Sequence, residues 1–226
     1  MIAVAMRSLA YVVLFSSTVA AGADAVRVIE TRSVPAEQLP ATKSATHDLK
    51  LSLYAFHGSR WLPADIITAV VDALPLLTRC GVAIASADLR ILDAPRRFHF
   101  FSTPVSRELL REFTVQKPAL LFVDDTYSTP AYDAEAIGLS NAHERPELTN
   151  TIWFAYGARD LPLAIAHELV HVLSDNGDHS DAPDNLMRPG TAATQTRLTD
   201  AQCNRLRIVA EANGLITRRA GVAGRK

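Results

Sequence analysis

Apolar residues recur along the chain at two different spacings, which together predict a mixed fold. Alternating apolar and polar positions over 49–57 predict a strand, and the continuous apolar run over 119–123 predicts a buried strand. From Pro63 onward the apolar positions instead repeat at helical spacing, and they do so again over 163–173. The fold class that follows is α/β of the α+β kind, built on a twisted mixed sheet with two main helices.

Weaker signals complete the order of elements. A last helix is expected after Thr199, which can act as N-cap while Gln202 completes a capping box, and it gives the chain a small helical C-terminal part. Pro75 lies inside the first helical pattern and is expected to kink that helix or end it early. Further strands and one short helix are expected, in chain order, over 82–84, 88–92, 105–113 (the helix), 136–139 and 151–156.

The first 25 residues have the composition of a secretory signal peptide. Arg7 supplies a positive charge, an apolar stretch follows over 9–21, and small residues over 21–25 offer an A-x-A cleavage site. The apolar stretch is too short to span a bilayer comfortably, and the alternative is an uncleaved anchoring segment. A secreted or periplasmic location is therefore expected.

Three regions are expected after the signal peptide. Residues 26–48 contain two prolines and no clear period, which predicts an irregular leader. Residues 49–217 are expected to form a single domain, because this length supports one core and not two. Residues 218–226 are basic and are expected to be a disordered tail.

Composition and charge narrow the class of partner. Hydrophobic residues make up 48% of the 226 residues and charged residues 21%, which is typical of a globular protein. The formal net charge of −1 leaves no basic excess for a nucleic-acid partner. No segment after the first 25 residues is apolar enough, over sufficient length, to span a membrane. The sequence does not indicate an oligomeric state.

The motif that carries chemistry lies in the second main helix. Residues 167–171 read His-Glu-Leu-Val-His, the pattern H-E-x-x-H. Residues four apart lie on the same face of a helix, so His167 and His171 can reach one metal ion. Glu168 lies about a hundred degrees around the helix axis, where its carboxylate can take a proton from a zinc-bound water. The sequence therefore predicts a zinc site with Glu168 as general base.

Catalytic zinc usually has three protein ligands, so a third is expected downstream. His179 follows the helix-breaking pair Asn176-Gly177 and is the first choice, because imidazole suits zinc. Asp175 and Asp178 are the alternatives. A calcium loop is a further interpretation of the acidic residues in this stretch, whose spacing does not match the EF-hand pattern: Asp175, Asp178, Asp181 and Asp184.

Together with Asn-Leu-Met-Arg-Pro at 185–189, this arrangement resembles the metzincin clan of zinc metallopeptidases, nearest to its matrixin-type members. The resemblance implies a zincin-like fold, a Zn²⁺ cofactor and a metallopeptidase-like domain over 49–217. It also implies three metal ligands, a general base and a methionine beneath the metal: His167, His171, His179, Glu168 and Met187. The chain departs from the clan pattern at Ser174, where the clan has a glycine, and at Gly177, where it has the third histidine.

The expected export affects how the two cysteines are interpreted. In an oxidising compartment Cys80 and Cys203 most simply form one disulfide, with free thiols as the alternative. The sequence around Cys80 also resembles the cysteine switch of matrixin precursors, but it lies where no prodomain has room. Three histidines outside the motif are expected to be surface or structural residues: His57, His99 and His143.

The function expected from these residues is hydrolysis of peptide bonds in a peptide or protein substrate by a zinc metalloendopeptidase. The same ligands would also suit a zinc amidase or carboxypeptidase acting on cell-wall peptides. A non-catalytic secreted zinc-binding domain is the alternative outside enzymology. Glu168 argues against that last alternative, because a purely structural zinc site does not need a base.

Overall fold

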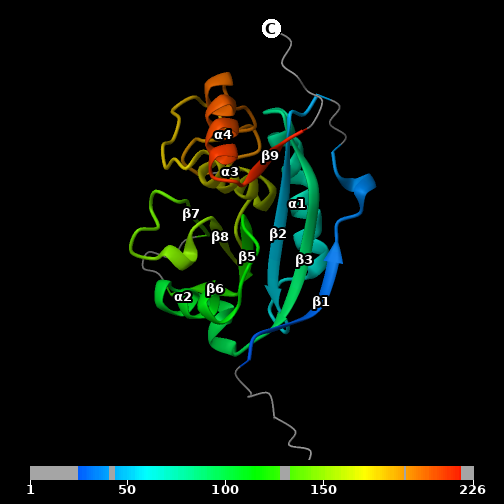
Figure 1. The fold of residues 1–226 in the computed structure, drawn as a ribbon, viewed down its shortest axis with the longest axis vertical. Helices are drawn as coiled ribbons and strands as arrows, with labels where there is room; N and C mark the ends of the chain where they lie inside the picture. The colour runs from blue at the N-terminus through cyan, green and yellow to red at the C-terminus, as the bar shows by residue number, and fades with distance from the viewer. Residues whose placement is uncertain (1–24, 41–43, 128–132, 191, 220–226) are drawn as a thin grey trace, which may run out of the picture.

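A seven-stranded mixed sheet forms the centre of the computed structural model, which describes residues 25–40, 44–127, 133–190 and 192–219 (Figure 1). The strand order is β1-β3-β2-β5-β8-β7, and β9 pairs with β2. Strands β3, β2, β5 and β8 run parallel, while β1, β7 and β9 are antiparallel to their neighbours. The strand bounds are β1 Arg27–Ser33, β2 His47–Phe56, β3 Val82–Asp93, β5 Ala119–Val123, β7 Ala134–Ile137, β8 Thr151–Ala155 and β9 Ile216–Arg218. A separate two-stranded sheet pairs β4 (Phe100–Phe101) with β6 (Asp125–Thr126).

Helices cover both faces of this sheet. The α-helices are α1 Pro63–Thr78, α2 Thr103–Glu112, α3 Leu161–Ser174 and α4 Asp200–Ala212, and three short 3₁₀ helices span Ala36–Gln38, Arg96–His99 and Pro146–Leu148. Along β2, Leu53 and Ala55 pack in one core with α1 and α3, while Tyr54 and Phe56 pack in the other with Leu109 of α2. This alternation follows from the two-residue period of a strand. The observed fold is the mixed α/β class expected from the sequence.

Several elements lie close to where the apolar pattern predicts them. Strand β5 has the predicted bounds, and the other predicted strands and helices are present with ends shifted by a few residues. The two strand pieces predicted over 82–84 and 88–92 are one strand, β3. Helix α1 continues past Pro75 to Thr78. Proline removes one helical hydrogen bond, and the burial of Leu74, Leu76 and Leu77 offsets that loss.

The predicted irregular leader is wrong over much of its length. Residues 27–33 form β1, which pairs antiparallel with β3, and β2 already begins at His47. Every residue of β1 is exposed, so hydrophobic periodicity gives no signal for this edge strand. Its pairing rests on the sheet ladder and on polar contacts such as the hydrogen bond from Ser33 Oγ to Asp88, 2.6 Å long.

The beginning of the predicted basic tail is also ordered. Arg218 belongs to β9 and pairs with Glu211 of α4 at 2.8 Å. Arg219 donates a hydrogen bond to the carboxylate of Asp48 at 2.7 Å. These ion pairs and the pairing of β9 with β2 hold this segment in place. From its charge alone, the segment was expected to be a solvated end. The rest of the predicted tail, 220–226, and residues 1–24 of the predicted signal peptide lie outside the described residues.

A disulfide joins Cys80, just after α1, to Cys203 in α4, as the sequence predicts. It connects two elements 123 residues apart in sequence. A disulfide is consistent with an extracellular or periplasmic location. Among the described residues, none of the helices has the length and apolar character needed to cross a bilayer.

Candidate metal centre

Helix α3 carries the H-E-x-x-H motif and lies between the sheet and α4. Figure 1 shows α3 and α4 together at one end of the molecule, where β9 also lies. Pro162 in the first turn fits the start of the helix, where its missing N–H would have had no partner. Most of the helix is buried, including Leu169 and Val170 between the two motif histidines. The core therefore fixes the rotation of α3 and presents the face with His167 and His171.

Two backbone carbonyls orient these imidazoles. His167 Nδ1 lies 2.7 Å from the carbonyl oxygen of Leu186, and His171 Nδ1 lies 2.6 Å from that of Asn176. A carbonyl oxygen only accepts hydrogen bonds, so both Nδ1 atoms carry the hydrogen. Each Nε2 is then left with a lone pair, which is the tautomer that binds a metal.

The two Nε2 atoms face each other across 3.0 Å. Two lone pairs at this distance repel unless a cation, either a proton or a metal ion, lies between them. Burial lowers the pKa of His167 to about 4 and also lowers that of His171, and the hydrogen bonds to Leu186 and Asn176 oppose this shift only in part. Both shifts favour the neutral imidazoles, whose free Nε2 lone pairs can bind a metal ion.

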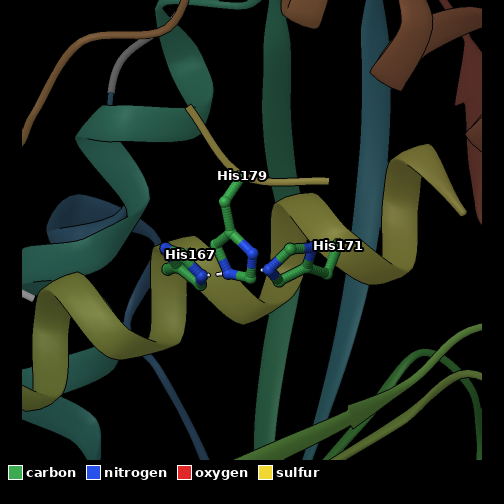
Figure 2. A group of neighbouring side chains, drawn as sticks. All are labelled: His167, His171 and His179. Atoms are coloured by element: carbon green, nitrogen blue, oxygen red, sulfur yellow. Dashed lines mark hydrogen bonds between the residues drawn. The ribbon is translucent and has the colours of Figure 1, made fainter. Parts of the chain in front are cut away.

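His179 completes a group of three. One ligand nitrogen from each of the three histidines lies within 4.8 Å of the other two. In Figure 2, His167 and His171 extend from α3, while His179 reaches the same point from the chain segment that follows the helix. The rings of His167 and His179 are stacked, with centroids 5.3 Å apart, and His171 lies edge-on to both. His167 is buried, His171 half-buried and His179 exposed, so the group opens to solvent on the His179 side.

The donor set fits a zinc ion. Three neutral imidazole nitrogens are ligands that zinc accepts in catalytic sites, and tetrahedral geometry puts ligand nitrogens about 3.3 Å apart. The separations in the structure, 3.0 Å for one pair and at most 4.8 Å for the others, are close to that value. The three histidines can hold a metal ion, as predicted, and the identity of that ion belongs to the proposal below.

The turn between the second and third histidines differs from the one expected. Asp175, with φ of 44°, takes the left-handed conformation that ends α3. The sequence favoured Asn176-Gly177 for this turn, but Gly177 is not among the residues with positive φ. Aspartate tolerates the left-handed region better than most residues, so the helix ends without glycine. The helix therefore runs to Ser174, three residues past His171, before the chain turns at Asp175.

Neither rival carboxylate occupies the third position. Asp175 Oδ1 accepts a hydrogen bond from the backbone N–H of Ser140 at 2.8 Å, and Asp175 is not part of the metal-binding group. Asp178 is exposed, and its charge opposes the lowering of the His171 pKa. Among the described residues, the metal-binding group contains histidines alone. His57 and His143 are exposed and His99 is buried beside Asp124, in keeping with surface or structural roles.

Glu168 lies beside the histidines at the bottom of an open cleft. Burial, followed by the nearby charge of Glu135, raises the pKa of its carboxyl to about 7. It lines two adjacent cavities of about 440 and 400 Å³, one beyond His171 and His179 and the other beyond His167. A carboxyl group with this pKa, in reach of both cavities, can exchange a proton near neutral pH.

Residues of edge strand β7 line both cavities. Ala134 lines both, and Glu135 lines the first, where Arg145 pairs with it at 2.7 Å. The second cavity also contains Arg159 and Asp160, from the start of α3 and the loop before it. The two cavities share Ala134 and Glu168, and together they adjoin all three histidines, His171 and His179 in the first and His167 in the second.

Residues 185–189, which we call the methionine turn, contact two of the histidines. Met187 is 2% exposed and lines a small cavity of about 150 Å³ together with His179. Its carbonyl oxygen accepts a hydrogen bond from Ser180 N at 2.8 Å, which ties the segment after His179 to the turn. The preceding carbonyl, of Leu186, is the acceptor for His167 Nδ1. The turn therefore supports two of the three histidines.

Sequence reasoning missed the residues that surround this group. Glu135 and Arg145 come from an edge strand and a loop with no motif. Their relevance depends on packing between segments distant in the sequence, for which a single sequence holds no signal. A search found neither a family model nor a curated protein that matches this chain.

Proposed function

We propose that this protein is a secreted zinc metalloendopeptidase, with His167, His171 and His179 as metal ligands. The observation that carries the proposal is the convergence of three imidazoles with Glu168 beside them. Two of the imidazoles are fixed in the metal-binding tautomer by backbone carbonyls. A structural zinc site is usually closed by four protein ligands, whereas this group has three and opens into a cleft.

The residues of the chain divide the chemistry among them. Zinc, when bound, supplies Lewis-acid activation of water and of a substrate carbonyl. Glu168 would accept the proton that this water loses and pass it to the leaving amine. The hydrogen bonds from His167 and His171 to carbonyl oxygens keep both rings in place during this exchange.

The cleft supports cleavage within a chain rather than at its end. It continues on both sides of Glu168, beyond His167 in one direction and beyond His171 in the other. A carboxypeptidase or amidase that recognises a chain end needs a barrier on one side of the metal. An extended substrate can instead lie along β7, whose outer edge has no strand partner among the described residues.

Membership of the metzincin clan is part of the proposal. The buried Met187 next to the His167 contact, the third histidine after a left-handed turn and the antiparallel edge strand β7 support it. Export is supported by the disulfide between Cys80 and Cys203.

The test uses purified protein beginning at Val26, loaded with one equivalent of zinc and incubated with a peptide library. Internal cleavage that stops with a chelator and returns with zinc is the expected result. Glu168→Gln should retain zinc and lose at least about a thousandfold in kcat, because it removes a base and no ligand. Cleavage confined to chain ends would indicate the carboxypeptidase or amidase alternative. Zinc binding without any hydrolysis would indicate a non-catalytic domain.

A further inference from the structure

Asp175 occupies a position that is unfavourable for an aspartate on two grounds. Its φ of 44° lies in the left-handed region, which glycine adopts without steric cost. It also lies at the C-terminal end of α3, where the partial negative charge of the helix disfavours a carboxylate. Glycine would end the helix with neither penalty, so the side chain itself needs an explanation.

The carboxylate of Asp175 binds the wall of the cleft. Its Oδ1 accepts the hydrogen bond from Ser140 N at 2.8 Å. Residues 138–145, which we call the wall loop, follow β7 and line the larger cavity through Gly138, Ser140 and Arg145, among others. The far end of this loop is held by the ion pair of Arg145 with Glu135. Asp175 thus provides the contact that fixes the near end.

The backbone around Asp175 serves the metal centre. Its N–H caps the helix on the carbonyls of His171 and Val172. The next residue, Asn176, provides the carbonyl for His171 Nδ1 and donates its own N–H to His171 O at 3.1 Å. Asp175 therefore supports the turn before His179 through its backbone and holds the wall of the cleft through its side chain.

Gly138 shows how closely the wall approaches. A Cβ atom at this position would lie 2.7 Å from Asp175 Oδ1, closer than real Cβ contacts. Gly138 has no positive φ, so its backbone conformation would accept alanine. A glycine is thus needed here for the space that the carboxylate occupies, and the two positions form a matched pair.

We propose that Asp175 is a positioning residue whose carboxylate holds the wall loop against the end of α3 and thereby sets how tightly the cleft binds substrate. The role in substrate binding rests on the proposed function, because that function assigns the cleft as the site where the peptide binds. The role in holding the wall does not depend on any activity.

A double-mutant cycle tests the pairing, using Asp175→Gly, Gly138→Ala and the two together in the zinc-loaded protein. Asp175→Gly keeps the left-handed turn and removes the hydrogen bond to Ser140. We expect KM to rise about fivefold to tenfold, with kcat and zinc affinity within about twofold of wild type. Gly138→Ala should raise KM similarly, and should add nothing in the Asp175→Gly background, where no carboxylate remains to be displaced.

Asp175→Asn is the rescue variant, because its amide oxygen can accept the same hydrogen bond, and it should keep a KM near that of wild type. Asp181→Gly is the matched control, an exposed aspartate in the same connection. Additive effects in the cycle, or a wild-type KM in Asp175→Gly, would overturn the proposal.

Hydrogen exchange of the Ser140 amide separates this proposal from the proposed function. Asp175→Gly and Gly138→Ala should each speed its exchange about tenfold, whereas Asp175→Asn and Asp181→Gly should leave it unchanged. This measurement needs no hydrolysis. A wild type that cleaves no peptide would refute the peptidase assignment alone, while unchanged Ser140 exchange in Asp175→Gly would refute the role of Asp175.

Discussion

The side chains of Asn185 and Gln202 exchange two hydrogen bonds, of 3.0 and 3.1 Å, between the methionine turn and α4. Asn185 is buried and also accepts the N–H of Met187 at 2.9 Å. Gln202 in turn completes the capping box of α4 with Thr199, which the sequence predicts. The start of α4 therefore fixes the turn whose carbonyl, at Leu186, orients His167.

Asn185→Ala is accordingly expected to weaken zinc binding although the residue touches no metal ligand. It leaves Met187 N and the Gln202 amide without their partner and loosens the carbonyl that orients His167. Outer contacts of this kind typically change metal affinity by about 10- to 100-fold. Competition with a chromophoric chelator measures the affinity. Asn204→Ala, on the exposed side of α4, is the control and should keep wild-type affinity.

His179→Ala is expected to reduce zinc affinity far more than Asp178→Ala. His179 supplies a nitrogen to the three-histidine group, whereas Asp178 is exposed and acts on His171 only through its charge. Loss of one of three ligands should cost at least about a hundredfold in affinity, against less than about tenfold for the aspartate. Isothermal titration of both variants decides the matter. Unchanged affinity in His179→Ala with loss in Asp178→Ala would transfer the role to the carboxylate.

The raised pKa of Glu168 predicts a pH-dependent cost in the metal-free protein. The unfolded chain ionises this carboxyl near its ordinary pKa of 4.5, and the folded protein only near 7. Between these values the unfolded state has lost the proton that the folded state still holds, so stability falls as pH rises from 4.5 to 7. Above pH 7 the cost stays constant, at roughly 3 kcal/mol for a shift of this size.

Glu168→Gln removes that ionisation, so its stability advantage over wild type should grow from pH 4.5 to 7 and then level off. Chemical unfolding of both proteins in the presence of a chelator measures the difference. An advantage that is independent of pH would mean that Glu168 ionises in the folded protein as it does in water.

Reduction of the disulfide is expected to destabilise the fold. The bond closes a loop across 123 positions of sequence, which corresponds to about 4–5 kcal/mol in the chain-entropy model. Thermal unfolding with and without a reductant, and of the Cys80→Ala/Cys203→Ala variant, measures the effect. The disulfide joins the end of α1 to the start of α4. The Cys80→Ala/Cys203→Ala variant should therefore also lose zinc more readily. Equal stability of oxidised and reduced protein would contradict this expectation.

The elements that the sequence predicted are those with a strong apolar period. Strand β5 and helix α3 bury almost every residue that their patterns mark as apolar, so local pattern and tertiary structure agree. Strand β1 has no buried residue, and β9 is only three residues long, so neither has a period to detect. Their positions follow from pairing with β3 and β2, which is a property of the folded chain.

The candidate site likewise has one part that local sequence predicts and another that depends on the folded chain. His167, Glu168 and His171 lie on one helix, where spacing alone determines which side chains share a face. His179 is separated from them by a turn. Several residues were candidates for that position, because the geometry of a loop depends on contacts with distant parts of the chain. The left-handed Asp175 is an example, since its cost is offset by contacts with Ser140 and with the end of α3.

The disulfide has a consequence for the fate of a damaged molecule. Helix α3, the three histidines, the wall loop and β7 all lie between Cys80 and Cys203 in the sequence, inside one covalent ring. A single backbone cut anywhere within this ring, by the protein itself or by another protease, opens the ring without releasing a fragment. The two pieces would travel together on a gel until a reductant parts them, and the cut site would stay packed against its own core.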